Sequence, residues 1–62
     1  MRKLPKDGVL LEFTRVGNAT KVCAIDQKSG TEVSIVGPTS ASEADLREVV
    51  IRKLKYVLSK ES

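Results

Sequence analysis

The side chains that most often perform chemistry in proteins are scarce in this 62-residue chain. It contains a single cysteine, Cys23, and no histidine. Without histidine the commonest general acid and base is missing, and a serine or cysteine nucleophile lacks its usual activator. Cys23 is expected in the middle of a strand beside Lys21, where a small apolar filler is the simpler role and a reactive thiol is the alternative. We therefore expect no enzyme and no catalytic residue.

Cofactor and metal sites are not expected either. One cysteine without histidine can neither close an internal disulfide nor supply the normal ligands of a structural zinc site. Gly17, Gly30 and Gly37 are each needed for a turn, and no glycine-rich phosphate-binding loop is found. Acidic side chains near strand ends are normally solvated. We expect this of Glu12, Asp26 and Glu32.

Length and composition indicate a single small domain. At 62 residues a lone hydrophobic core leaves a stability margin of only about 3–5 kcal/mol, so help from a partner chain is plausible. An unpaired thiol is typical of a reducing interior, and no window approaches the roughly 18 apolar residues of a membrane helix. We expect a soluble cytoplasmic protein. The net charge of +3 permits an acidic partner but is common in ordinary domains.

The elements that must position these side chains begin with a hairpin. Residues 1–8 carry basic residues without periodicity and predict a flexible basic N-terminal arm, which leaves 9–60 as the folded domain. Alternating and β-branched residues predict strands at Val9–Val16 and Ala19–Asp26, and Gly17-Asn18 between them has the chemistry of a two-residue turn.

A third strand and a helix complete the predicted domain. The strand is expected at Thr31–Val36, ended by Gly37-Pro38. Ser40 with Glu43, or Ser42 with Asp45, offers a capping box, so the helix should start between Ser40 and Ser42 and run to about Ser59. Apolar residues then recur at helical spacing, at Leu46, Val49, Val50, Leu54, Val57 and Leu58, with Ala44, Ile51 and Leu58 along one margin of this stripe.

The two turns fix which side chains share a face of the sheet. A two-residue turn at Gly17-Asn18 pairs Phe13 with Val22, and a turn closed by Asp26 and Thr31 pairs Val22 with Ile35. Both registers select the same apolar layer, which consists of Val9, Leu11, Phe13, Val22, Ala24, Val33 and Ile35. The sequence thus predicts an α+β fold in which a three-stranded antiparallel meander is followed by a C-terminal helix packed on one face. Arg15 shares that side and is expected to orient the helix through a salt bridge or a contact with the helix C-terminus.

The opposite face of the sheet is the first candidate for function. One helix cannot cover both sides of a sheet, so this face either stays in water or meets another molecule. Leu10 and Ile25 are expected to be cross-strand partners with Cys23 and Val36 close by. The candidate interface comprises Leu10, Val16, Cys23, Ile25 and Val36.

Nucleic-acid binding is the alternative. The basic helix and the arm could contact a phosphate backbone, but base stacking needs aromatic side chains. The chain has only Phe13, expected in the core, and Tyr56. The basic residues that would make such a contact are Arg47, Arg52, Lys55 and Lys60; a solvated helix face is their simpler interpretation.

A longer pattern of residues resembles a known family. It includes Arg15-Val16-Gly17-Asn18, Ala24-Ile25-Asp26, the run from Gly30 to Pro38, and Arg52-Lys53-Leu54. From about Leu11 to Lys60 the chain is similar to small alphaproteobacterial proteins that form a domain of unknown function. The resemblance implies a bacterial cytoplasmic origin and no catalytic residues. Some members carry the name serine hydroxymethyltransferase, but such a pyridoxal-phosphate enzyme needs a large fold and a Schiff-base lysine in a built pocket.

These observations favour a small non-catalytic binding or scaffolding module. We expect it to act by protein–protein contact through the open sheet face or an exposed strand edge, with an unknown protein or a second copy of itself as partner. A homodimer is one form of this contact, weak nucleic-acid binding is the alternative function, and no membrane partner is expected.

Overall fold

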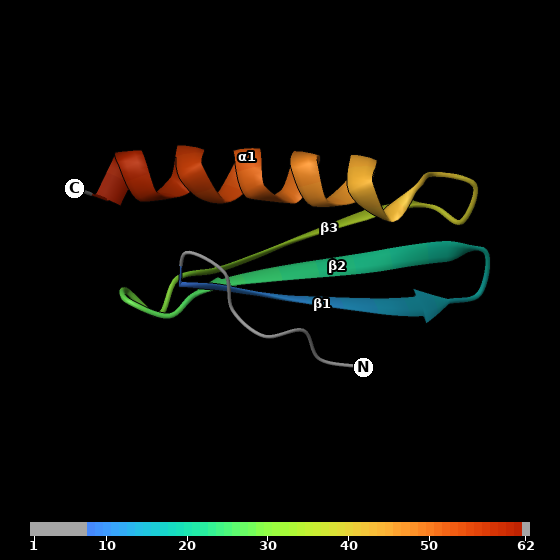
Figure 1. The fold of residues 1–62 in the computed structure, drawn as a ribbon, viewed down its shortest axis with the longest axis horizontal. Coiled ribbons are helices and arrows are strands. Elements are labelled where there is room, and N and C mark those ends of the chain that lie inside the picture. Colours follow the sequence, from blue (N-terminus) through green and yellow to red (C-terminus); the bar gives the residue numbers. More distant parts are fainter. Residues whose placement is uncertain (1–7, 62) are drawn as a thin grey trace.

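The computed structural model describes residues 8–61 and contains three strands followed by one helix (Figure 1). Strands β1 (Val9–Val16), β2 (Ala19–Asp26) and β3 (Glu32–Pro38) form one antiparallel sheet in the order β1-β2-β3, and helix α1 (Glu43–Glu61) packs against it. The predicted α+β fold is confirmed. The expected N-terminal arm falls on residues 1–7, outside the described residues, apart from Gly8.

Both predicted registers are confirmed. Phe13 pairs with Val22 across β1 and β2, and Val22 pairs with Ile35 across β2 and β3. Gly17 has a φ of 60°, in the left-handed region that a two-residue hairpin turn requires and that glycine adopts without steric cost. Strands β1 and β2 have the predicted bounds. A two-residue turn at Gly17-Asn18 allows one register in which the alternating apolar residues of both strands share a face.

Asp26 organises the second turn. Its main-chain N–H donates to the Thr31 carbonyl at 2.8 Å, and its carboxylate accepts hydrogen bonds from the Ser29 hydroxyl at 2.7 Å and the Ser29 N–H at 3.1 Å. Gly30 completes the reversal with a φ of 79° and donates to the Asp26 carbonyl. The Asp26 carboxylate therefore has a structural role within the turn.

Strand β3 differs from its predicted bounds at both ends. It begins at Glu32 and continues through Gly37 and Pro38 instead of stopping at Val36. The main-chain hydrogen bond from Asp26 to Thr31 shows that Thr31 directs its C=O toward β2. Because this direction alternates along a strand, the odd-numbered residues of β3 bond to β2 and the even-numbered residues point to the outer edge. Pro38 is even-numbered, so its missing N–H lies on the outer edge and costs no bond within the sheet.

Helix α1 uses the second of the two predicted caps. The Ser42 hydroxyl accepts the Asp45 N–H at 3.1 Å, and the Ser42 carbonyl accepts the Leu46 N–H at 3.0 Å, so Ser42 is the N-cap and Ser40 is not. The helix runs on to Glu61, two residues past the expected end. Lys60 and Glu61 are compatible with continued helix, since neither is a glycine or a proline.

The core lies between α1 and the two strands β2 and β3. The buried residues of the described chain are Val22, Ala24, Val33, Leu46, Val50 and Leu54. Because α1 makes most of its contacts with β2 and β3, the apolar residues that β1 contributes to the same layer stay only partly buried. These are Val9, Leu11 and Phe13. The predicted helix stripe is correct except at Val49, which is 45% exposed.

Candidate interaction surfaces

The open face of the sheet carries the five predicted interface residues in two groups, one toward each end of the sheet. Leu10 pairs with Ile25 near the start of β1, and Cys23 is the next residue of β2 on that face. Val16 lies at the opposite end of the sheet, next to Ala19, and Val36 pairs with Lys21. Lys21 is four residues from Ile25 along β2, about 13 Å at strand spacing. The expectation that Val36 lies close to Leu10 and Ile25 is therefore wrong.

Polar side chains lie between the Leu10–Ile25 pair and the two valines, although Cys23 is the diagonal neighbour of Val36 across β2 and β3. The middle of the open face holds Glu12, Thr14, Lys21 and Ser34, as the registers require. Leu10, Cys23 and Ile25 are half-buried, whereas Val16 is 61% exposed and Val36 69%. The apolar area on this face is thus real but divided, and its most exposed members are the two valines at the turn end.

Among the described residues, Lys21, two positions before Cys23 on the same face of β2, is the basic neighbour that could favour a reactive thiol. Cys23 is a free, half-buried cysteine, and its cross-strand neighbours are Glu12 and Ser34. Neither cross-strand neighbour is a base of the kind that activates a thiol, and Cys23 is not at a helix N-terminus. Residues 8–61 contain no group of three or more side chains that could hold a metal ion.

The basic residues of α1 do not form one stripe. At about 100° per residue, the four predicted nucleic-acid contacts, Arg47, Arg52, Lys55 and Lys60, spread over an arc of about 220°. The Arg52 guanidinium lies 3.9 Å from the Glu48 carboxylate, and the Lys60 ammonium lies 5.3 Å from the centre of the Tyr56 ring. All four are exposed, but the acids Asp45 and Glu48 interrupt the positive surface.

A second incompletely covered surface lies between α1 and β1. The Lys53 ammonium donates to the Ser34 carbonyl at 2.9 Å, which places that side of the helix over β3. Ile51 lies about 160° around the helix from Lys53, so it faces β1. Leu58, two helical turns after Ile51, lies on the same side of the helix. We call the half-buried set Val9, Leu11, Phe13, Ile51 and Leu58 the β1 flank.

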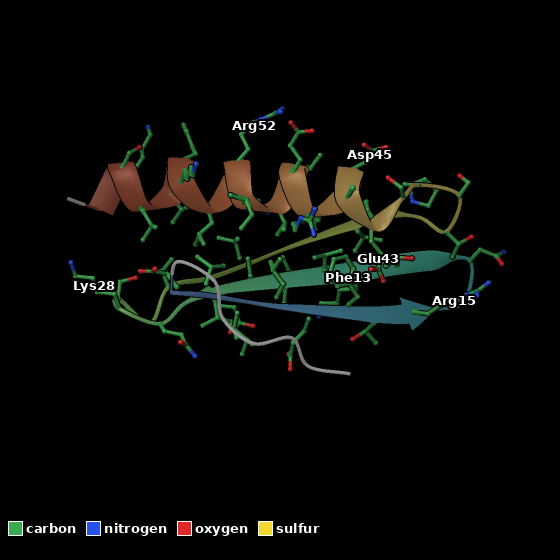
Figure 2. The ribbon with its side chains drawn as sticks, viewed as in Figure 1. Phe13, Arg15, Lys28, Glu43, Asp45 and Arg52 are labelled. Atoms are coloured by element: carbon green, nitrogen blue, oxygen red, sulfur yellow. The ribbon has the colours of Figure 1, made fainter. Side chains whose placement is uncertain are left out.

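Figure 2 shows Phe13 on this helix-facing side of β1. Sequence reasoning placed these residues in the core and so missed the surface. The broad apolar margin of the helix was the available signal.

Arg15 does not play the structural role expected of it. Figure 2 places it at the end of the sheet near the start of α1, not near the helix C-terminus. Its side chain is exposed, and no ion pair joins it to another of the described residues. The register of the hairpin correctly predicted that Arg15 lies on the helix side of the sheet. The C-terminal carbonyls of α1, however, lie at the opposite end of the sheet from Arg15 (Figure 1).

The fold and these surfaces define a small α+β domain in which one helix covers part of one sheet face. The chain belongs to the family of the domain of unknown function DUF6898, whose model matches residues 6–61. This confirms the resemblance to a family of unknown function. Comparison with curated proteins and with solved structures gave no match. No helix within residues 8–61 is long and apolar enough to cross a membrane.

Proposed function

We propose that this protein is a small non-catalytic binding or scaffolding module that works in the cytoplasm by protein–protein contact. The contact surface is the open sheet face or the edge of an outer strand. The observation that carries this proposal is the incomplete cover of the sheet: α1 lies on one side only, and Val16 and Val36 on the other side are more than half exposed.

The scarcity of activating groups among the described residues supports the non-catalytic part of the proposal. The chain has no histidine, and its one thiol lies mid-strand between a carboxylate residue and a serine. The hollow in the surface of α1 is lined by residues of that helix alone, such as Ala44, Ile51 and Lys55, so it is not enclosed by a second element. Binding pockets for small molecules are normally concave and built from several elements.

An affinity capture from the native cell tests this proposal. The bait is the wild-type chain, and the matched control is the double variant Ile25→Lys, Val36→Lys, which places charge in both apolar groups of the open face without changing β1. We expect a protein partner, or a second copy of the chain, that the wild type retains. Loss of this capture in the double variant assigns the contact to the open face, and retention assigns it to a strand edge.

A salt series separates this function from nucleic-acid binding. Contacts between lysine or arginine and phosphates weaken steeply as salt rises. Capture of generic DNA or RNA at low salt that disappears near physiological salt, with no protein retained by any bait, would contradict the proposed function and support the alternative.

A further inference from the structure

The two outer edges of the sheet are not equally available for pairing. The even-numbered residues of β3 direct their main-chain groups outward, and one of these groups, the Ser34 carbonyl, already accepts the Lys53 ammonium at 2.9 Å. Pro38 at the end of the same edge has no N–H to offer. Lysine and proline are two of the devices by which proteins protect an edge strand. The β3 edge is therefore partly closed.

Among the described residues, nothing protects the β1 edge in this way. Gln27 donates its N–H to the Gly8 carbonyl at 2.8 Å, and Val16 pairs with Ala19 next to the two-residue turn. Both pairs show that the even-numbered residues of β1 direct their main-chain N–H and C=O groups toward β2. The main-chain groups of Val9, Leu11, Phe13 and Arg15 consequently point away from the sheet. Among residues 8–61, β2 is the one strand that pairs with β1.

The same four residues place their side chains on the helix side. Three of them belong to the β1 flank and are half-buried, because α1 stops short of β1. A strand added to this edge would gain main-chain hydrogen bonds and would lay its alternate side chains beside Leu11 and Phe13. Few surfaces on the described part of the molecule offer both kinds of interaction together.

We propose that β1 pairs antiparallel with β1 of a second copy, around a two-fold axis that passes through the Phe13 pair. The proposal rests on the strand-edge form of the proposed function and names its partner. In this register Phe13 faces its own copy. On the open face Leu10 lies opposite Val16 of the second copy, and Glu12 lies opposite Thr14. Apolar residues thus meet apolar residues, and a carboxylate meets a hydroxyl.

Registers shifted toward the N-terminus of the partner are less favourable. A shift by two residues toward the N-terminus of the partner sets Glu12 directly opposite its own copy, and like charges in that position are destabilising. A further shift of the same size sets Leu10 opposite Glu12 and loses the match with Val16. The Phe13 register leaves Arg15 opposite Leu11, where the aliphatic stem of the arginine can cover the leucine while its charge stays in water.

The size of the domain favours a second copy over a loosely held peptide. Among residues 8–61 the buried core consists of six side chains, none of them aromatic, and the single cysteine excludes an internal disulfide. Domains this small commonly gain stability from oligomerisation when they lack a disulfide or metal. A standard interface buries about 800 Å² on each partner. One strand edge is smaller, so we expect self-association in the micromolar range.

Sedimentation velocity over a range of concentrations, with two matched proline variants, tests this inference. Arg15→Pro and Val36→Pro each replace an exposed residue whose N–H points to an outer edge, the first on β1 and the second on β3. We expect the wild type and Val36→Pro to dimerise alike, and Arg15→Pro to associate at least about tenfold more weakly, because each interface loses two symmetry-related hydrogen bonds. Circular dichroism and thermal melts check that both variants stay folded.

Disulfide trapping tests the register in a Cys23→Ser background. An equimolar mixture of Glu12→Cys and Thr14→Cys chains should form a mixed disulfide, because this non-hydrogen-bonded pair brings the two Cα atoms to about 4.5 Å. Glu12→Cys chains alone should stay unlinked. A Glu12→Cys homodimer would overturn the Phe13 register.

Failure of the inference is distinguishable from failure of the proposed function. A wild type that stays monomeric at millimolar concentration overturns self-pairing, whereas the affinity capture decides the binding function separately. A dimer that Ile25→Lys abolishes and Arg15→Pro leaves intact also overturns the edge pairing, and it places self-association on the open face.

Discussion

Gly37 sets the distance between β3 and the start of α1. A Cβ atom built on this residue would lie 2.5 Å from Leu46 Cδ2, well inside van der Waals contact. Leu46 is buried, so its side chain has little room to move away. The need for glycine here is thus one of space, unlike Gly17, where the positive φ demands it.

The change Gly37→Ala should destabilise the fold by about 1–3 kcal/mol, the usual cost of overpacking a core. Chemical denaturation measures this value. The control is a double-mutant cycle with Leu46→Ala, in which the added methyl group has space and the cost of Gly37→Ala should fall markedly. An equal cost in both backgrounds would show that the strain lies in the backbone and not in the contact with Leu46.

At the scale of elements, the start of α1 depends on which serine caps it. Both Ser40 and Ser42 have an acid three residues later, so the sequence alone left two choices. The structure selects Ser42, whose hydroxyl accepts the Asp45 N–H. This choice fixes the angle at which the chain leaves β3, with the Ala41 N–H donating to the Pro38 carbonyl at 3.1 Å.

The change Ser42→Ala should cost about 1 kcal/mol of stability, because one of the first helical N–H groups loses its acceptor. Ser40→Ala is the matched control and should change the free energy of unfolding by less than about 0.5 kcal/mol, as for other exposed surface positions. Urea denaturation of the two variants beside the wild type gives both values. A larger loss in the Ser40 variant would contradict the assignment of the cap.

The sequence predicted the sheet far better than the position of the helix on it. Turn chemistry at Gly17-Asn18 and the alternation of β1 determine register and parity, since a slip by one residue would turn Phe13 and Leu11 away from the core. Helix periodicity identifies the apolar stripe but not which strands it covers. The placement of α1 depends on contacts distant in sequence, such as Lys53 to Ser34 and Leu46 to Gly37. The broad apolar margin of α1 therefore signals additional apolar surface, but its location beside β1 could not be predicted.

At the scale of the whole molecule, the uneven cover of the sheet divides the apolar residues into two energetic classes. Leu54 of α1 is 1% exposed where the helix packs on the sheet, whereas Leu11, on the helix-facing side of β1, is half-buried on the β1 flank. Both are leucines of one domain whose total stability margin is about 3–5 kcal/mol. Their truncation should therefore have different consequences for the folded population.

Leu54→Ala should cost about 2–5 kcal/mol, because it removes a fully buried side chain and leaves a cavity between α1 and the sheet. This loss is comparable to the whole margin, so the variant should be largely unfolded at 25 °C by circular dichroism. Leu11→Ala should remain folded in dilute solution with a loss of about 1–2 kcal/mol, and at high concentration its deficit should grow if the β1 flank is buried between two copies. Equal losses for the two variants in dilute solution would mean that α1 covers β1 as completely as it covers β2, and the β1 flank would then not be a surface.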